Sequence, residues 1–503
     1  MNTVYMIKNT KYLKVFLFCA ILLFFLLVSN NIHAESTKIS GIYNEDLAPT
    51  CVDDGYKVID DQGTIRLEVI PAKGHQFSDW TFDADGRTKT HRCEICGYEE
   101  TIHVSSVSDD SIPQLKLNGS LEGIGKKSRV VVEADFQSQD QNFTCYGILT
   151  LQGHSTYGLP KKNYTIRFYD DQKGEEKHKL QFKNWRKEHK YILKANYADL
   201  SQSRNLAGGK IWADMVQTRN HVSQRILDLP TYGTVDGFPV AVYLNDSFMG
   251  LYTLNLHKDD DLYRLKKEEQ EALLICNAQT TEESLFLSTA AFAEDYSSDW
   301  EVEFCGTEDE SWAKESFNQL ISFVMNSNDQ EFRENLGNYL DTDAAVDYLL
   351  FIYALGLQNS GAKDLVLVNY DGQWIPSAFD MEEAFGLDEN NGKYLKADDF
   401  VPTLSDGGWS SNTGSLLWDR LLNNYTEQIL DRYHMLRSNS FSEDYMIKCV
   451  HDYFDSVPET WYDEDFYLYP DRPVKDNEMI VQIEKYIKDR MQVLDRVFGG
   501  EDE

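Results

Sequence analysis

The hydrophobic and polar positions of the chain follow two different periods in two consecutive regions. From about residue 115 to 262, apolar residues alternate with polar ones or form short runs that end at turn residues, as in SRVVVEADF, YGILTLQG, NYTIRFYD, KYILKANY and FPVAVYLN. Alternation with a period of two is typical of β-strands. The stretch SRNLAGGKIWADMVQTR has a helical pattern instead. We therefore expect a β-rich region with a helix inside it.

From about residue 310 to 500 the apolar residues recur at i, i+3 and i+4, the spacing of amphipathic helices. The pattern is found in WAKESFNQLISFVMN, LDTDAAVDYLLFIYALGL, GSLLWDRLLNNYTEQILDRYHMLR and EMIVQIEKYIKDRMQVLDRVF. Asp341 is the candidate N-cap of the second of these helices. Strands that come first and helices that follow predict an α+β fold with two lobes.

Two β-hairpins are predicted by their turn residues. YLNDSFMGLYTL turns at Asn245-Asp246, and DLVLVNYDGQWIPSAFD turns at Asp371-Gly372. A hairpin brings its two ends together. We therefore expect Asp364, at the start of the second hairpin, to lie near Asp380, at its end.

The first 34 residues have the order of a secretory signal peptide. Lys8, Lys11 and Lys14 precede the apolar run VFLFCAILLFFLLV, and Ala34 is a candidate cleavage point. The run is shorter than the roughly 20 residues that a membrane-spanning helix prefers, and its retention as an anchor is the alternative. No second long apolar run follows, so we expect a secreted protein with no membrane contact beyond this segment.

Composition and charge narrow the class of function. The formal net charge of −35 makes nucleic acid a poor candidate partner, because a phosphate backbone requires a basic surface. Hydrophobic residues make up 42% of the 503 residues, enough for a large core. Most of the acidic residues are expected on the solvated surface, because Asp and Glu are rarely buried without a partner.

Residues 35–106 form a separate segment, followed by a polar linker over 107–114. The segment holds four candidate zinc ligands: Cys51, His75, Cys93 and Cys96. Two thiolates fixed by a CxxC turn, together with two distant ligands, suit a tetrahedral zinc site. The alternatives are a disulfide within the CxxC pair and a plain surface turn. The phrases TCVDDGY, GHQFSDW and RCEICG resemble small cysteine-containing modules of exported proteins from Gram-positive bacteria.

The stretch PSAFDMEEAFG places acids among apolar residues, where an unpaired carboxylate is costly to bury. Asp380 and Glu382, with Asp364 and the amide of Asn359, form an oxygen-rich set. Such a set suits Mg²⁺ or Mn²⁺ that carries phosphate groups. The alternative is that Asp380 and Glu382 pair with arginines or with backbone amides.

Basic residues precede this set along the chain. Lys161 and Lys162 follow a glycine-containing turn in LQGHSTYGLPKKNYTIRF, which suits a polyphosphate but is also common in ordinary hairpins. Arg204 follows Asp199 where a strand meets a helix. Its guanidinium suits either a phosphate or an ion pair at the start of the helix.

Five phrases in a fixed order carry a resemblance to a known family: GHSTYGLPKKNYTIRF, KYILKANYADLSQSRN, PVAVYLNDSFMGLYTL, YDGQWIPSAFDMEEAFG and SLLWDRLL. Over about residues 110–500 the chain resembles the spore-coat-protein-H-like (CotH) family of atypical kinases. The resemblance implies a protein-kinase-like domain over 115–500, with a β-rich N-lobe (about 115–262) and a helical C-lobe (about 310–500). It also implies transfer of the ATP γ-phosphate to serine in a protein of the cell envelope or spore coat.

The resemblance also implies roles for individual residues. Asp380 matches the family's metal-binding Asp, and Glu382 takes the place of its second acid. Basic positions on the nucleotide side are matched by Lys161, Lys162 and Arg204.

One departure from the family pattern concerns the catalytic loop. The family usually has an Asp followed five residues later by an Asn, whereas here Asn359 precedes Asp364. An amide cannot accept a proton, and general-base catalysis contributes about 10²–10⁴-fold. Phosphoryl transfer, however, depends mostly on positioning and charge neutralisation. A catalytically weak or inactive scaffold that binds ATP is therefore the alternative, and the residues leave open whether phosphate or AMP is transferred.

Overall fold

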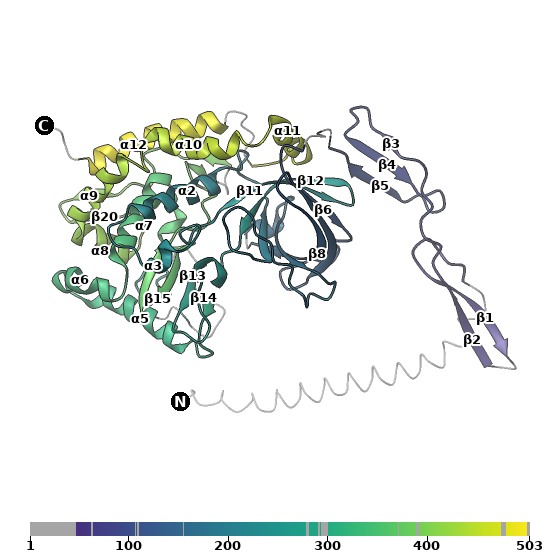
Figure 1. Ribbon diagram of the computed structural model, residues 1–503, viewed down its shortest axis with the longest axis horizontal. Helices are drawn as coiled ribbons and strands as arrows, with labels where there is room; N and C mark the ends of the chain where they lie inside the picture. Colours follow the sequence, from purple (N-terminus) through teal and green to yellow (C-terminus); the bar gives the residue numbers. More distant parts are fainter. Residues whose placement is uncertain are drawn as a thin grey trace, which may run out of the picture. The chain divides into compact units, whose positions relative to one another are not determined.

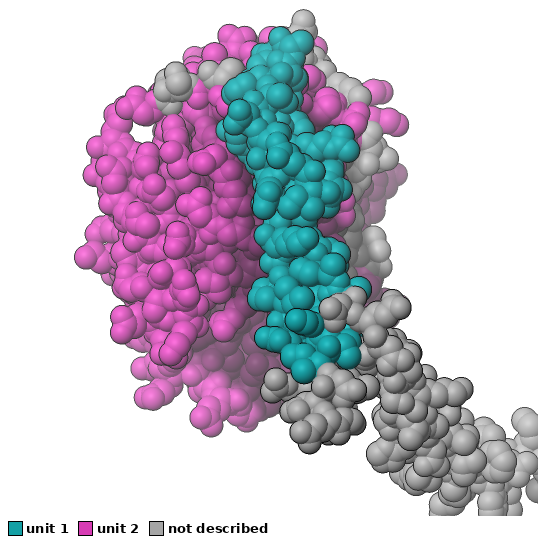
Figure 2. All heavy atoms as spheres, turned by 90° about the vertical axis from the view of Figure 1, so that its right-hand side faces the viewer, with its two compact units in different colours: residues 1–102 teal, residues 103–503 magenta. Residues whose placement is uncertain are grey.

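The fold is described from a computed structural model (Figure 1) that covers residues 47–499 except 62–63, 106, 108–109, 154, 278–280, 290–291, 293–299, 371, 389–391 and 474–478. The predicted signal segment 1–34 and Asp371 of the second hairpin turn lie outside the described residues. The chain divides into two compact units, residues 1–102 and 103–503, which Figure 2 shows in different colours.

The described part of the first unit consists of short antiparallel strands in two small sheets. One sheet pairs β1 (Gly55–Asp61) with β2 (Thr64–Ile70), and the other contains β3 (Thr81–Phe82), β4 (Thr88–Arg92) and β5 (Glu99–His103). The thiols of Cys51 and Cys93 are buried, whereas the large side chains of Val52 and Phe82 are exposed. A unit with so small a core usually needs a disulfide or a metal ion to be stable.

Seven strands of the second unit close into a barrel. Every second side chain points inward, and the interior includes Leu115, Phe136 and Tyr191. Only β6 and β11 pair in parallel within the barrel. In barrel order the strands are β10 (Lys190–Lys194), β12 (Ser247–Leu256), β11 (Gly237–Leu244), β6 (Gln114–Asn118), β7 (Val130–Gln137), β8 (Asn142–Gln152) and β9 (Asn163–Tyr169).

The turn between β11 and β12 confirms the first predicted hairpin. Leu244 pairs with Ser247, which leaves Asn245 and Asp246 as the two turn residues. Their φ angles are 49° and 66°. Positive φ at both positions is the requirement of a type I′ turn, which Asn and Asp tolerate better than most residues.

The helix predicted inside the β-rich region is α2 (Arg204–Gln217). Its two adjacent glycines allow close packing. A Cβ atom on Gly209 would stand 2.5 Å from the carbonyl oxygen of Val235, and one on Gly208 would stand 3.0 Å from the Cβ of Met381. Met381 lies in the acidic stretch described above, so α2 packs directly against the candidate site.

The remainder of the second unit is a four-stranded sheet with helices. The sheet has the order β14 (Trp300–Cys305), β13 (Ala272–Cys276), β15 (Val366–Tyr370) and β16 (Gln373–Ser377). Beside it α7 (Thr342–Leu355) is buried from Ala344 to its end. Asp341 caps α7 as predicted, because its carboxylate accepts a hydrogen bond from the N–H of Ala344 at 2.9 Å.

The other helices and short strands complete this unit. The helices are α3 (Gln224–Leu227), α4 (Asp260–Tyr263), α5 (Ser311–Asn326), α6 (Asp329–Asn335), α8 (Leu416–Asn424), α9 (Thr426–Arg437), α10 (Glu443–Phe454), α11 (Glu459–Leu468) and α12 (Met479–Phe498). The short strands are β17 (Leu387–Asp388), β18 (Lys393–Tyr394), β19 (Thr403–Ser405) and β20 (Gly408–Ser410).

The mixed α+β fold is confirmed, with the barrel strands before the helices α5 to α12, although β15 to β20 lie between α7 and α8 (Figure 1). The closure of the first region into a barrel was not predicted. The stretch 414–437, expected as one helical segment, forms α8 and α9 with a break at Tyr425. Within the described residues, no helix combines the length and the apolar character that crossing a membrane requires.

Candidate functional site

The hairpin formed by β15 and β16 positions the acids that the sequence singles out. Val366 pairs with Ser377 at the open end of the hairpin. Asp364 precedes β15 and Asp380 follows β16, so both emerge at this end. The charge of Asp380 acts on the carboxyl of Asp364. The predicted convergence of the two acids therefore follows from the strand register.

Both acids occupy a backbone conformation that is unfavourable for a residue with a side chain. The φ angles are 65° at Asp364 and 53° at Asp380, which costs about 1–3 kcal/mol at each position. Neighbouring contacts hold this backbone in place. The N–H of Asp364 donates to the carbonyl oxygen of Cys276 at 3.0 Å, and the N–H of Met381 donates to Asn205 Oδ1 at 3.1 Å. Strained acids at one hairpin end are a common feature of functional sites.

A lysine that the sequence analysis did not select lies against these acids. Lys194 is the last residue of β10 and is buried. Its Nζ lies 3.3 Å from Asp380 Oδ1 and 2.9 Å from Glu382 Oε1. The barrel therefore supplies the cation, and the segment after β16 supplies both carboxylates. The phrase KYILK offers a weak sequence signal, because its final lysine ends a buried strand.

The electrostatics of the acids differ although they share one site. Burial, and then the charge of Asp380, raise the pKa of Asp364 to about 7. Burial acts against ionisation of Asp380 too, but Lys194 outweighs it and lowers the pKa of that carboxyl. Burial raises the pKa of Glu382 despite its contact with Lys194. Asp380 is therefore the more firmly ionised acid, and the pKa of Asp364 lies near neutral pH.

Lys258 adds a second positive charge on the segment that follows β12. Its Nζ lies 4.1 Å from the ring centroid of Phe379, the residue before Asp380. Burial lowers the pKa of Lys258, and the nearby charges of Glu303 and Asp380 oppose that effect. The site thus combines acids and amines that suit an anionic ligand carried by a cation.

The amide of Asn359 is directed at a neighbouring acid. Asn359 lies in a 3₁₀ turn over 359–361, and its Nδ2 donates to Glu383 Oε2 at 2.8 Å. Glu383 follows Glu382 directly. The amide of Asn359 therefore stabilises the carboxylate of Glu383, which a carboxylate at position 359 would repel.

Arg204 joins α2 to the segment that follows Asp380. Its guanidinium donates to the carbonyl oxygens of Ala384 and Phe385, the latter at 3.1 Å. It also lies 3.3 Å from Asp199 Oδ1 and donates to Gln482 Oε1 at 2.7 Å. These contacts correspond to the ion-pair alternative of the sequence analysis. Arg204 therefore holds the backbone of Ala384 and Phe385, just after the acids Asp380 and Glu382.

The structure places the two predicted lysines in other surroundings. Lys161 is buried, and its Nζ lies 2.9 Å from Asp465 Oδ1 and donates to the carbonyl oxygen of Leu251. Asp465 also forms an ion pair with Arg472. Burial lowers the pKa of Lys161 to about 8. Lys162 donates to the carbonyl oxygen of Tyr157 at 2.9 Å.

The four candidate zinc ligands come together in the first unit. One ligand atom from each of them can be chosen so that all lie within 4.8 Å of one another: Cys51, His75, Cys93 and Cys96. The sulfurs of Cys51 and Cys93 are 3.7 Å apart, and Cys96 Sγ lies 3.4 Å from His75 Nδ1. These cysteines are free thiols rather than a CxxC disulfide. Three sulfurs and one imidazole are a common zinc donor set.

One thiol of this cluster, that of Cys93, has a lowered pKa. Burial acts to raise the pKa of Cys93, but hydrogen bonds from the backbone N–H of Cys96 and from the side chain of His75 lower it to about 5. Burial and the neighbouring sulfurs raise the pKa of Cys51 to about 11. A cation that binds here would therefore meet at least one thiolate at neutral pH.

Acids at the end of a β-hairpin meet lysines from a β-rich region here, an arrangement that can bind a phosphate through a cation. The family model for the CotH kinase protein matches residues 149–494, well over half of the chain, and the chain belongs to this family. The match includes the acids and lysines of the site and leaves out the first unit. No curated protein matches the chain.

Proposed function

We propose that this CotH kinase family member is exported and transfers the γ-phosphate of ATP to serine residues of a cell-envelope or spore-coat protein. The observation that carries the proposal is the group formed by Asp364, Asp380 and Glu382 with Lys194. Its geometry supports phosphate chemistry, and the family supports a kinase. Serine as acceptor, the envelope or coat as location and export itself rest on the resemblance and on the predicted signal segment.

The donor set fits a divalent cation of the Mg²⁺ or Mn²⁺ kind. Asp380 is ionised, and Asp364 has a carboxylate whose nearest cationic partner, Lys363, is 3.9 Å away. These two oxygen donors would hold the ion, and Glu382 would support it. When bound, the ion would neutralise charge on the phosphates.

The residues of the chain would do the remaining work. Lys194 would orient a phosphate oxygen while it holds Asp380 in place, and Lys258 would face the same group. Arg204 would keep the acidic segment fixed through its backbone contacts. Asp364 is the acid best placed to accept a proton from an attacking hydroxyl, because its pKa is raised to about 7. Roles for Lys161 and Lys162 at the nucleotide stay predictions.

A second candidate function is supported by the position of Asn359. Its amide is hydrogen-bonded to Glu383 and cannot act as a base. If Asp364 does not replace it, the protein would bind ATP with little turnover and serve as an assembly scaffold. The cluster of Cys51, His75, Cys93 and Cys96 would hold Zn²⁺ in either case, as a stabilising element of the first unit.

One experiment separates the two candidates. The purified protein is incubated with a casein-type serine substrate, Mn²⁺ and ATP labelled at either the γ- or the α-phosphate. We compare the wild type with Asp380→Ala and with Asp398→Ala, which removes an exposed acid elsewhere. γ-Label transfer by the wild type and by Asp398→Ala, but not by Asp380→Ala, supports the kinase.

The other outcomes are equally informative. α-Label transfer would identify AMP as the group moved. A rise in melting temperature on addition of ATP and Mn²⁺ without any transfer would support the scaffold. Equal transfer by all three proteins would overturn the assignment of the site.

A further inference from the structure

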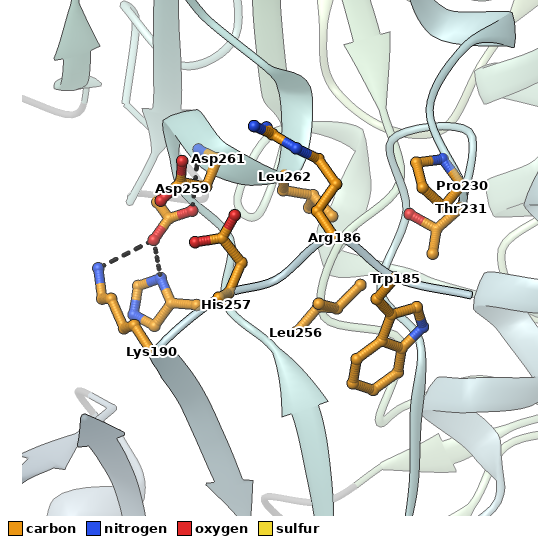
Figure 3. A pocket seen from close by; sticks show the side chains of 11 residues that line it. Trp185, Arg186, Lys190, Pro230, Thr231, Leu256, His257, Asp259, Asp261 and Leu262 are labelled. Atoms are coloured by element: carbon orange, nitrogen blue, oxygen red, sulfur yellow. Dashed lines mark hydrogen bonds and ion pairs between the residues drawn. The ribbon is translucent and has the colours of Figure 1, made fainter. Parts of the chain in front are cut away.

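The charged groups of the acid–lysine site are carried by segments that neighbouring residues hold in place. Lys258 stands between His257 and Asp259 in the chain. Figure 3 shows how this segment is held: Asp259 Oδ2 lies 3.1 Å from Lys190 Nζ and 3.2 Å from His257 Nδ1. A different segment, the Asp364 loop between α7 and β15, carries Asp364. The residues that hold this loop therefore decide where the carboxylate of Asp364 stands.

Two buried aromatic side chains donate hydrogen bonds to the backbone of the Asp364 loop. The hydroxyl of Tyr348, on α7, donates to the carbonyl oxygen of Ser360 at 2.8 Å. The indole N–H of Trp418, on α8, donates to the carbonyl oxygen of Gly361 at 2.7 Å. Both aromatic residues are at most 1% exposed, and Ser360 and Gly361 are buried too. Removal of either donor would therefore leave a buried carbonyl group without that hydrogen bond, which is costly.

The two aromatic donors also pack against each other. The ring centroids of Tyr348 and Trp418 are 5.5 Å apart, with an interplanar angle of 24°. Gly361 fits tightly against its neighbour, because a Cβ atom on it would stand 2.7 Å from the Cβ of Thr413. Close packing of this kind leaves few alternative positions. Two consecutive carbonyl groups of the Asp364 loop are therefore fixed by side chains from two different helices.

Only a short stretch of chain separates these two contacts from the acid. Asp364 follows Gly361 by three residues, and its φ angle is 65°. Such a backbone persists only where the surrounding structure holds it. At the acid itself, the N–H of Asp364 donates to the carbonyl oxygen of Cys276 at 3.0 Å. The Asp364 loop is thus held before the acid by Tyr348 and Trp418, and at the acid by β13.

Trp418 lies in the phrase SLLWDRLL, one of the five that carry the resemblance to the CotH family. The charged residues of this phrase are engaged elsewhere. Asp419 accepts a hydrogen bond from the N–H of Ser411, and Arg420 donates to a backbone carbonyl oxygen of α5. Among the hydrogen bonds described for this phrase, the one from the indole of Trp418 reaches the Asp364 loop. The phrase therefore meets the candidate site through this indole.

We propose that Tyr348 and Trp418 are positioning residues of the kinase reaction, which hold the Asp364 loop so that the carboxylate of Asp364 stays at the hairpin end with Asp380. The proposal rests on the proposed function, because it concerns the acid assigned there to the metal ion and the attacking hydroxyl. Both aromatic side chains act through the backbone of the loop rather than by contact with substrate. A displacement of about 1 Å at a reacting group can lower a rate by about 10²-fold. Loss of either hydrogen bond should therefore reduce turnover more than nucleotide binding.

Two tyrosines on the same helix give a matched pair of variants. Tyr348→Phe removes the hydroxyl that donates to the Asp364 loop at 2.8 Å. Tyr353→Phe, the control, removes a hydroxyl that donates to the carbonyl oxygen of Ser411, also at 2.8 Å. Both tyrosines lie on α7 and are at most 1% exposed. The two variants therefore lose the same kind of buried hydrogen bond, but only the bond from Tyr348 ends on the Asp364 loop.

A second pair of variants tests the indole. Trp418→Phe removes the N–H that donates to Gly361. Its control is Trp312→Phe on α5, where the indole N–H donates to Thr307 Oγ1 at 2.7 Å. If Trp418→Phe does not fold, the tyrosine pair alone answers the question, because Tyr348→Phe removes a single oxygen atom and keeps the ring.

The wild type and the four full-length variants are assayed for kcat and for the KM of ATP, with a serine substrate and Mn²⁺. Mn²⁺ affinity in the presence of ADP, the melting temperature and amide hydrogen exchange of the metal-free protein are measured too. We expect kcat to fall by about 10–100-fold in Tyr348→Phe and Trp418→Phe, with the KM of ATP within about twofold of the wild type. In these two variants Mn²⁺ affinity should fall and exchange at Asp364 should become faster. Both controls should keep the kcat, the Mn²⁺ affinity and the Asp364 exchange of the wild type, although their melting temperatures fall as well.

Equal kcat and equal exchange in Tyr348→Phe and Tyr353→Phe would overturn the proposal, and so would a higher KM of ATP with an unchanged kcat. Absence of phosphate transfer by the wild type would contradict the proposed function instead. Mn²⁺ affinity and exchange at Asp364 then decide: a change in Tyr348→Phe but not in Tyr353→Phe supports the positioning role, and equal values overturn it. Failure of this proposal and failure of the kinase assignment are therefore distinguishable.

Discussion

At the scale of single residues, the acids around Asp380 are neutralised by the chain itself. Lys194 contacts both Asp380 and Glu382. The side chains of Lys194 and Glu382 are largely buried, whereas that of Asp380 is 34% exposed. An ion pair in such a place stabilises little by itself, but removal of one partner leaves uncompensated charge. Lys194 and a metal ion are therefore expected to share the task of balancing these acids.

Replacement of Lys194 by Met should show that Lys194 and a metal ion both neutralise the charge of Asp380 and Glu382. In the absence of divalent cations Lys194→Met is expected to lose about 1–3 kcal/mol of unfolding free energy, because buried Glu382 and partly exposed Asp380 lose their cation and water screens part of the charge of Asp380. Added Mn²⁺ should raise its melting temperature more than that of the wild type. Phosphate transfer should fall by about 10²-fold or more. Lys448→Met, at an exposed lysine on α10, serves as the control, and an equal response to Mn²⁺ in all three proteins would contradict the interpretation.

Asn359 gives a second prediction at this scale. Asn359→Asp places a carboxylate where an amide donates to Glu383 at 2.8 Å. We expect a loss of about 1–3 kcal/mol in unfolding free energy, measured by urea denaturation, because Glu383 loses its donor and gains a like charge. The companion variant Asn359→Asp/Glu383→Gln should recover most of the loss. A stable Asn359→Asp protein would show that this hydrogen bond is unimportant.

At the scale of elements, the Gly-Gly pair sets the distance between α2 and its neighbours. Gly209→Ala would place a methyl group 2.5 Å from the carbonyl oxygen of Val235. We expect a loss of about 1–3 kcal/mol, despite the better helix propensity of Ala, because backbone must move. Gly158→Ala is the control, since nothing lies within 4 Å of the added Cβ. Thermal denaturation of both variants checks this, and a more stable Gly209→Ala protein would contradict the packing argument.

The contact between α10 and α12 is expected to depend on pH through His451. Its Nε2 lies 2.9 Å from Glu484 Oε1 and its Nδ1 lies 3.0 Å from Asp455 Oδ2. The hydrogen bond with Glu484 raises the pKa of His451 above its ordinary value, although partial burial opposes it. A raised pKa means that the folded state holds the proton more tightly than the unfolded chain.

The stabilisation should therefore be complete below the unfolded pKa and should disappear as the pH rises through the folded pKa. Since the group is about one-third exposed, we expect only about 0.5–1 kcal/mol. His451→Gln should be less stable than the wild type in urea at acidic pH, and the difference should shrink in alkaline buffer. If the stability difference between the wild type and His451→Gln grew with pH, the pKa of His451 would be lowered in the folded state rather than raised.

At the scale of the whole molecule, the two units should respond differently to metal removal. The Cys/His cluster belongs entirely to the first unit, whose described core is small. Structural zinc supplies about 10–16 kcal/mol in small domains. A zinc-selective chelator should therefore release one zinc ion and abolish amide protection in residues 47–102, while the second unit keeps its protection. Cys93→Ser should behave like the chelated protein, and unchanged exchange in the first unit after metal removal would exclude a structural metal.

Much of the fold could be predicted from the sequence because periodicity and turn chemistry are local properties. The helix around α2, the N-cap at Asp341 and the turn at Asn245-Asp246 follow from residues close together along the chain. Closure of the barrel was not predictable in this way. It depends on the parallel pairing of β6 with β11, two strands far apart in sequence.

The candidate site shows the same division. Asp364 and Asp380 converge because one hairpin joins them, and a hairpin is readable from its turn. Lys194 comes from a different strand, and only packing of the barrel against the acidic segment brings it there. Lys161 looked like the better candidate because of its glycine turn, but it lies beside Asp465, more than 300 residues later in the chain.

By itself, the sequence determined the main β-rich and helical regions, the hairpin that carries the acids, the four candidate metal ligands of the first unit and the resemblance to the CotH family. Each of these depends on neighbouring residues or on short phrases. The tertiary structure alone decided which lysine meets Asp380, and what Arg204 and Lys161 bind. The physical reason is that charge pairs in a buried site are set by distance in space, and that distance depends on the packing of the entire fold.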